Sequence, residues 1–279
     1  MGLVLKPIDA HSIGELWQLV NADPVRHCFV AGRLEQHGLT GITRRTLEII
    51  GAFDGERLDS AMLFGANLVP IATSQESQRV FADALIRQGR RCSSIVGPAN
   101  EVMQLWSMLE ADWGPAREVR KNQPVMQTQH LSPLTPDDLV NYSSLMDLDI
   151  IFPACVAMFT AEVGISPTKN GGAAGYRNRI SELITTRRSF SRIDNEQVTF
   201  KAEVGCVGAG VAQIQGVWVN PELRRQGIGA HGLAKVVKLV LQDIAPTVSL
   251  YVNDFNATAI AVYEKVGFKQ VDSFATVLF

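Results

Sequence analysis

The segment that most limits the fold is an apolar stretch that enters a glycine turn and leaves it as a helix. Residues 211–219 read as a strand, and the turn follows as Arg224-Arg225-Gln226-Gly227-Ile228-Gly229-Ala230. Beyond the turn, apolar residues recur at the spacing of one helix face: Leu233, Val236, Val237 and Val240. Glycines let backbone N–H groups approach an anion closely, and the positive end of the helix dipole adds to the attraction. The segment therefore predicts an α/β domain with a site for an anion such as pyrophosphate.

The spacing of the glycines separates this turn from two common nucleotide loops. It has neither the Gly-x-Gly-x-x-Gly pattern of dinucleotide-binding folds nor the Gly-Lys-Ser/Thr of P-loops, and reads instead Arg/Gln-x-x-Gly-x-Gly/Ala. A second segment follows it at residues 250–268. This segment contains Leu250-Tyr251-Val252-Asn253, then Asn256, and then Tyr263-Glu264-Lys265-Val266-Gly267-Phe268.

The two segments together resemble the acetyl-CoA motif of the GCN5-related N-acetyltransferase (GNAT) family. The resemblance covers about residues 129–279 and implies a mixed, mainly antiparallel sheet flanked by helices. In this family the strand before the turn separates from its neighbour, and the pantetheine arm of the cofactor pairs with the exposed edge. The resemblance implies these cofactor-binding residues: Val217, Val219, Arg224, Arg225, Gln226, Gly227, Ile228, Gly229, Ala230, Asn253, Asn256 and Tyr263. Asn256 also suits the N-cap of the following helix.

The resemblance also implies catalytic roles. The N–H near Val217 would stabilise negative charge on the thioester carbonyl, and Tyr263 would protonate the leaving thiolate as general acid. The family commonly places a glutamate base on the strand before the turn, but this strand carries Gln213 and Gln215 instead. Glu203 and Glu162 are the two substitutes, and the sequence does not decide between them.

The segment from 149 to 167 falls where GNAT enzymes place the wall of the acceptor site. Phe152, Phe159 and Tyr176 are candidates to line this wall, although aromatic residues at such positions are more often core. The sequence does not identify the acceptor.

The first half alternates strands and helices without the glycine turn. Its nearest counterpart, Arg87-Gln88-Gly89-Arg90-Arg91, has one glycine and precedes a strand rather than a helix. Residues 1–128 therefore resemble a degenerate GNAT-like domain of the kind fused to GNAT domains in actinobacteria. The tandem arrangement is similar to that of mycothiol synthase. The connector at 131–136, which contains prolines, separates this domain from a GNAT domain at 129–279.

Hydrophobic patterns and turn residues predict the individual elements. We expect strands near 46–53, 58–71, 92–96, 118–128, 189–193, 198–205, 211–219 and 248–253. We expect helices near 74–89, 98–113, 136–147, 153–163, 176–186, 229–244 and 257–266.

Composition excludes several classes of function. The formal net charge of −2 argues against a nucleic-acid partner, and no run of eighteen apolar residues suggests a membrane span. We expect a cytoplasmic protein. The four cysteines are far apart and lack histidines at zinc-ligand spacing, so we expect buried thiols and no metal site.

The leading interpretation is an acetyl-CoA-dependent N-acetyltransferase that acts on a primary amine of a small molecule or protein. One alternative enzyme is a mycothiol-synthase-like acetyltransferase. A different class, favoured by the missing strand glutamate, is a non-catalytic sensor of acetyl-CoA or CoA. A third possibility is an interaction protein whose first half docks a partner or a second copy. The sequence leaves homodimer formation open.

Overall fold

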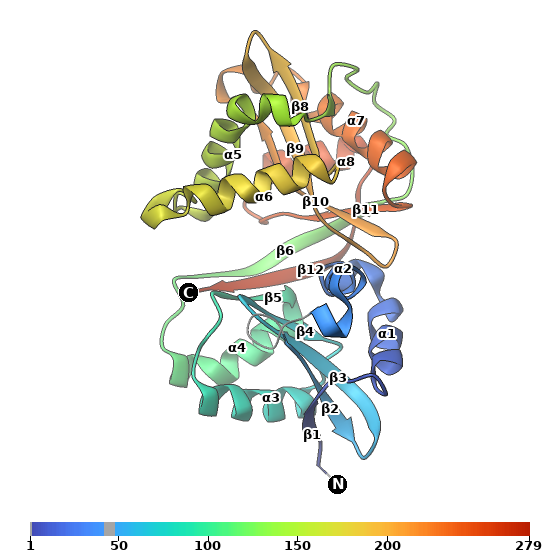
Figure 1. The fold of residues 1–279 in the computed structure, drawn as a ribbon, viewed down its shortest axis with the longest axis vertical. Helices are drawn as coiled ribbons and strands as arrows, with labels where there is room; N and C mark the ends of the chain where they lie inside the picture. Colours follow the sequence, from blue (N-terminus) through green and yellow to red (C-terminus); the bar gives the residue numbers. More distant parts are fainter. Residues whose placement is uncertain (1, 42–47) are drawn as a thin grey trace. The chain divides into compact units, whose positions relative to one another are not determined.

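A computed structural model describes residues 2–41 and 48–279, and Figure 1 shows its fold. The chain divides into two compact units. The first unit comprises residues 1–125, 251–256 and 270–279, and the second comprises residues 126–250 and 257–269. The sequence places all of 129–279 in one domain, whereas the last ten residues group with the first unit. The start of the strand expected at Thr46 lies outside the described residues.

The first unit is a sheet covered by helices. Its strands follow the order β1 (Val4–Pro7), β2 (Glu48–Asp54), β3 (Arg57–Phe64), β4 (Asn67–Ile71), β5 (Ser94–Pro98) and β12 (Lys269–Leu278). Neighbours are antiparallel except β4 and β5, which run parallel. The helices are α1 (Ile13–Ala22), α2 (Pro24–Gly41), α3 (Gln75–Gln88) and α4 (Ala99–Trp113). Strand β6 (Glu118–Thr128) begins in this unit and ends in the second.

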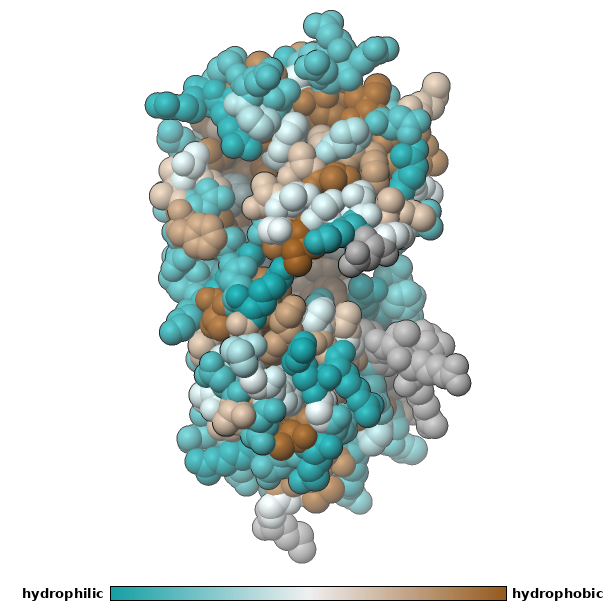
Figure 2. Space-filling view, turned by 90° about the vertical axis from the view of Figure 1, so that its left-hand side faces the viewer, coloured by the Kyte–Doolittle hydropathy of each residue, from teal (hydrophilic) through white to brown (hydrophobic). Residues whose placement is uncertain are grey.

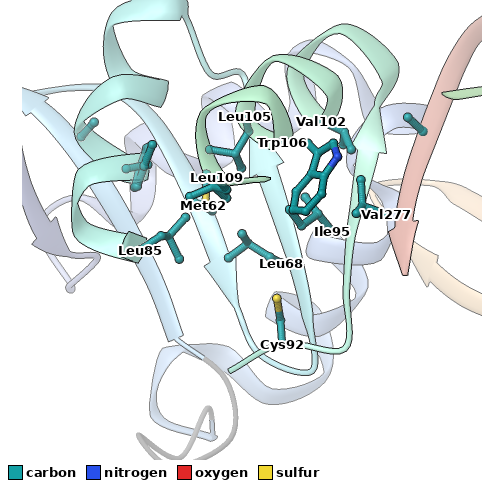
Figure 3. Close-up of a cluster of buried hydrophobic side chains, with 14 residues drawn as sticks. Met62, Leu68, Leu85, Cys92, Ile95, Val102, Leu105, Trp106, Leu109 and Val277 are labelled. Carbon is teal, nitrogen blue, oxygen red and sulfur yellow. The ribbon is translucent and has the colours of Figure 1, made fainter. Parts of the chain in front are cut away.

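Local sequence signals explain where helix α3 of the first unit begins and ends. Ser74 and Ser77 form a capping box at the start of α3, and Gly89 ends that helix with φ +70°. Helices α3 and α4 bury apolar residues against β3, β4 and β5, as Figure 3 shows. The helix expected between Ser74 and Gly89 is therefore confirmed.

The C-terminal strand completes the core of the first unit. β12 pairs antiparallel with β5 from Phe274 opposite Pro98 to Leu278 opposite Ser94. Val277 is fully buried, and Figure 3 shows it on β12 beside the cluster that contains Ile95 and Trp106. The sequence prediction omits this strand because an alternating pattern at the end of a chain does not reveal which strand it pairs with.

The second unit contains a run of mixed strands. Its strands follow the order β11 (Thr247–Tyr251), β10 (Val211–Val219), β9 (Gln197–Gly208), β8 (Ser189–Asp194) and β7 (Asn141–Tyr142). Only β10 and β11 among these run parallel. The α-helices are α5 (Leu148–Val163), α6 (Ala173–Thr185), α7 (Ile228–Asp243) and α8 (Ala257–Val266). The predicted class, a mainly antiparallel sheet flanked by helices, is confirmed.

The helix expected near 136–147 is wrong. The structure has β7 there, followed by a short 3-10 helix η1 (Leu145–Asp147). Asn141 lies opposite Ser191 of β8, and the Ser143 N–H donates to the Ser189 carbonyl. Pairing with a distant strand therefore overrides the local pattern. Helix α5 also begins at Leu148, five residues before the expected start, and contains Pro153 in its interior.

Helices α5 and α7 lie on opposite faces of the strands of the second unit. Successive residues of a strand point to opposite faces, so Phe200 and Lys201 of β9 mark the two sides. Gly232 of α7 lies against the Phe200 ring, where an added Cβ would be 2.9 Å from the ring carbons. Met158 of α5 lies on the Lys201 side, near Gly216.

Among the described helices, none combines the length and apolar character needed to cross a membrane. On the face drawn in Figure 2, hydrophilic residues predominate and hydrophobic ones occur in separate groups.

Candidate functional site

Strand β10 separates from β11 along its second half. The two strands pair at Val211 opposite Thr247, at Ala212 opposite Val248 and at Gln213 opposite Ser249. From residue 214 to the end of β10, the described part of the chain provides no further partner on β11. This edge of β10 can therefore accept an extended ligand through backbone hydrogen bonds.

A β-bulge interrupts the other edge of the same half-strand. Gln215 lies opposite Glu203 of β9, and pairing resumes at Trp218 opposite Lys201. Two residues of β10 thus face one residue of β9, which is the definition of a bulge. The first of the two, Gly216, has φ +60°, a conformation that favours glycine.

The turn after β10 leads directly into α7. A short 3-10 helix η3 (Pro221–Leu223) precedes it, and Arg225 and Gly227 have φ of +66° and +85°. Helix α7 starts after Gly227, and no described side chain caps its first turn. A Cβ on Gly229 would lie 3.2 Å from Val219 Cγ2, so glycine allows the helix to approach the strand closely.

Arg224, Arg225, Gln226 and Gly227 are exposed, while Ile228, Gly229 and Ala230 are partly buried. The Arg224 Nε donates to the Val219 carbonyl at 3.3 Å. The N–H groups of Ala230 and His231 donate to the Gly227 carbonyl, as the first bonds of the helix. An uncapped, exposed helix start with a left-handed glycine before it suits a phosphate group.

The corresponding turn of the first unit is closed by its own side chains. There β4 leads into α3, whose first turn is capped by Ser74. The buried Glu101 carboxylate accepts from the N–H and the hydroxyl of Thr73, the residue before the cap. The two helix starts therefore differ in chemistry: α7 is open to an anion, whereas the turn before α3 already holds a carboxylate of the chain itself.

Tyr263 lies on α8, and its ring packs against Phe268 at 6.2 Å between centroids. Burial, and secondarily the charge of Glu162, raise the pKa of Tyr263 to about 12. The hydroxyl therefore stays protonated near neutral pH and can act as a proton donor.

Glu162 is exposed in the last turn of α5. It follows Met158 by four residues and so shares the helix face that lies near the bulge at Gly216. Burial, followed by the charges of Glu203, Cys155 and Glu162, raises the pKa of Tyr176. The Glu162 charge thus contributes to raising the pKa of both Tyr176 and Tyr263.

Glu203 occupies a different setting. It is 2% exposed, and its carboxylate lies 2.6 Å from the Lys201 ammonium. The Cys155 thiol and the Gln215 amide also donate to it, at 3.5 and 3.4 Å. Burial alone would lower the pKa of Lys201, but Glu203 and then Cys155 raise it above its usual value. The raised pKa keeps the Lys201 ammonium protonated.

Lys201 is fully buried and is not among the residues that the sequence predicts for the site. A lysine and a glutamate two residues apart on an otherwise apolar strand share one face, and buried charges are rare unless paired. This pattern at Lys201 and Glu203 is the sequence signal that indicates a buried ion pair.

Asn253 and Asn256 belong to the segment that groups with the first unit. The Asn253 side-chain oxygen accepts from Gln123 at 2.9 Å, and the Asn256 N–H donates to the Asn253 carbonyl. Asn256 directly precedes α8. Their cofactor contacts stay a prediction.

The aromatic residues expected at the acceptor wall form one cluster. Tyr176 of α6 packs against Phe152 and Phe159 of α5, with centroids 6.0 and 5.4 Å apart, and its hydroxyl donates to the Cys155 carbonyl. Trp218 of β10 packs against the same core. The cluster therefore joins both helices to the strand that carries the bulge.

The described residues contain no group of three or more His, Cys, Asp or Glu side chains that could hold a metal ion. The four cysteines are thiols rather than disulfides. Cys28, Cys92 and Cys155 are buried, while Cys206 is partly buried.

Comparisons with known proteins agree with this geometry. Residues 189–268 match the model of the Acetyltransferase (GNAT) family, and residues 47–151 match a domain of unknown function, DUF4081. No curated protein matches the chain.

Several solved structures share the fold over nearly the whole chain. An acetyltransferase of the GNAT family from Colwellia psychrerythraea is 16% identical, with a TM-score of 0.58 and 99% of each chain covered. A GCN5-related N-acetyltransferase from Sphaerobacter thermophilus is 12% identical, with a TM-score of 0.60, covering 99% of this chain and 95% of the other. A tandem GNAT protein from the clavulanic acid biosynthesis pathway is 12% identical, with a TM-score of 0.57, covering 99% and 98%.

The family match lies on β8 to α8, the elements that carry the separated strand and the open turn, and the whole-chain neighbours include a tandem protein. The chain therefore has a tandem GNAT-like fold, and its residues 189–268 are similar to the acetyltransferase domain of the GNAT family.

Proposed function

We propose that this protein transfers an acetyl group from acetyl-CoA to a primary amine on a small molecule or protein. The observation that carries the proposal is the separated edge of β10, which runs into the open start of α7. A single ligand that combines an extended amide arm with a pyrophosphate would use both features.

The residues present suit that ligand. The backbones of Val217 and Val219 would hold the amide arm, and the N–H groups around Gly227 to Gly229 would hold the pyrophosphate. Arg224 and Arg225 are exposed beside this turn and add positive charge. Acetyl-CoA supplies the acetyl group as a thioester.

The side chains of this unit then supply the proton transfers. With acetyl-CoA bound, the Val217 N–H would stabilise negative charge on the thioester carbonyl oxygen, and the Tyr263 hydroxyl would supply the proton that the leaving thiolate needs. We propose Glu162 as the base that receives the proton of the attacking amine, because it is exposed and interacts electrostatically with Tyr263. Glu203 is less suited, since Lys201, Cys155 and Gln215 all donate to it in the interior.

Calorimetric titration with acetyl-CoA tests the proposal. We expect one saturable site per chain. Gly229→Val should abolish binding, because its side chain would meet Val219 and the phosphate position. Gly175→Ala is the matched control, since no described atom lies within 4 Å of the Cβ it adds. Absence of binding in the unchanged protein would contradict the proposal.

An acceptor screen then tests transfer. The screen should include free amines, peptide amines and an amino-sugar thiol conjugate, the last for a mycothiol-synthase-like activity. Release of CoA that depends on an amine would support transfer.

A CoA-binding sensor is the second candidate. The observation that favours it is the presence of Gln213 and Gln215 where the family commonly has a glutamate, because an amide cannot accept the proton of the amine. Saturable binding without CoA release for any amine would support the sensor.

A further inference from the structure

A buried ion pair covers the bulge of β10. Lys201 and Glu203 are two residues apart on β9, so their side chains share one face of the sheet. The register places them opposite Trp218 and Gln215, the two residues that flank the bulge. Their charged groups are 2.6 Å apart, and both side chains are almost completely buried.

The charged groups of Lys201 and Glu203 both lie next to Gly216, the glycine of the bulge. A Cβ on Gly216 would lie 3.4 Å from both the Lys201 Nζ and a carboxylate oxygen of Glu203, and 2.9 Å from Met158. A side chain at this position would therefore touch both charged groups and press against Met158. The Lys201 ammonium also donates to the Gly216 carbonyl at 3.3 Å.

This hydrogen bond acts on one peptide group. In a trans peptide the C=O of Gly216 and the N–H of Val217 point in opposite directions, so fixing the carbonyl toward Lys201 fixes the N–H on the other side. A cation bound to the carbonyl also polarises the peptide and strengthens its N–H as a donor. We propose that Lys201 is a positioning residue for acetyl transfer, which orients and polarises the Val217 N–H through the Gly216 carbonyl. The catalytic consequence rests on the proposed function.

Stability alone does not account for the two charges. A buried ion pair can often be replaced by uncharged residues of similar volume without loss of stability. The Lys201 ammonium donates a hydrogen bond to the Gly216 carbonyl, which an apolar side chain at position 201 could not do.

The test compares three variants of the full chain. Lys201→Met/Glu203→Gln removes both charges and the donor to Gly216. Lys201→Gln/Glu203→Gln removes the charges but keeps a donor. Cys155→Ala is the control, because it removes another donor to Glu203 and leaves Lys201 on the carbonyl. The measurements are the Val217 amide proton shift by NMR, acetyl-CoA affinity by calorimetry, and kcat.

With Met at position 201, we expect an upfield shift of the Val217 amide proton, acetyl-CoA affinity within about threefold, and kcat reduced by about tenfold to hundredfold. The variant with Gln at position 201 should fall between this one and the control. An unchanged Val217 shift, or a kcat within about twofold of the unchanged protein, in the folded Lys201→Met/Glu203→Gln variant would overturn the inference. Failure of the unchanged protein to transfer acetyl groups would overturn the proposed function instead, and the Val217 shift would still test the link from Lys201 to this peptide.

Discussion

Thr73 donates both its backbone N–H and its hydroxyl to one oxygen of Glu101, at 2.7 and 2.6 Å. Burial raises the pKa of Glu101 above its usual value, although the bonds from Thr73 act in the opposite direction. A carboxyl group whose pKa rises on folding binds more protons in the folded state than in the unfolded state. Its contribution to the unfolding free energy therefore falls as pH rises from the usual glutamate pKa through the raised value, and is constant above it.

Glu101→Gln should remove this pH dependence. Urea unfolding from about pH 4 to about pH 8 should show the variant gaining stability relative to the unchanged protein as pH rises through the window. Glu110→Gln, on an exposed position of the same helix, should give a curve parallel to that of the unchanged protein. A parallel curve for Glu101→Gln would contradict the prediction.

His27 should give a pH dependence of the opposite sign. Its ring is 3% exposed, and burial lowers the pKa of His27 to about 4. The folded state therefore binds fewer protons between that value and the usual histidine pKa, so acid should reduce the unfolding free energy by roughly 3 kcal/mol between about pH 7 and about pH 4. His27→Leu should lose most of this dependence, whereas His37→Leu, at an exposed position of the same helix, should keep it. Equal slopes for the two variants would rule out His27 as the source.

Local sequence signals predict those elements whose ends depend on nearby residues. The strand 118–128 and the helix 257–266 occur with the expected bounds, as β6 and α8. The helix expected at 136–147 fails because Asn141 pairs with a strand fifty residues away along the chain. β12 was omitted for the same physical reason, since its partner β5 is fixed by tertiary packing rather than by neighbours in sequence.

The candidate site shows the same division. The turn does precede a helix, and Tyr263 does lie on the helix that follows, because both placements depend on residue types at fixed spacing. Their cofactor and catalytic roles stay predictions. The hydrogen-bond partners of Glu203 could not be predicted from the sequence, because Cys155 and Gln215 come from other elements.

The C-terminal strand should stabilise the first unit through its inward-facing residues. Val277 is fully buried in the core that includes Trp106, whereas Val271 on the same strand is 48% exposed. Val277→Ala should lower the unfolding free energy by about 1–3 kcal/mol, and Val271→Ala by less than about 0.5 kcal/mol. Chemical denaturation monitored by tryptophan fluorescence measures both. A loss below about 0.5 kcal/mol for Val277→Ala would mean that β12 contributes little packing energy.

Two helical glycines should respond in opposite ways to the same substitution. A Cβ on Gly232 of α7 would lie 2.9 Å from the Phe200 ring, while a Cβ on Gly175 of α6 would meet no described atom within 4 Å. Gly232→Ala should therefore cost about 1–3 kcal/mol by overpacking, whereas Gly175→Ala should stabilise by about 0.5–1 kcal/mol through the better helix propensity of alanine. Thermal unfolding of the two variants decides this. Stabilisation by Gly232→Ala would show that α7 can move away from β9 at little cost.

Tyr263→Phe should separate cofactor binding from turnover. If the hydroxyl protonates the leaving sulfur, its loss should reduce kcat by about hundredfold while acetyl-CoA affinity changes by less than about threefold. Because the pKa of Tyr263 is raised to about 12, the hydroxyl stays protonated through the usual assay range, and the unchanged protein should show no alkaline loss of rate from this residue. Tyr142→Phe is the matched control, since the Tyr142 hydroxyl donates to Asp243 at the end of α7 and should affect kcat little. A Tyr263→Phe variant with full turnover would remove Tyr263 from the mechanism and require another proton donor in the second unit.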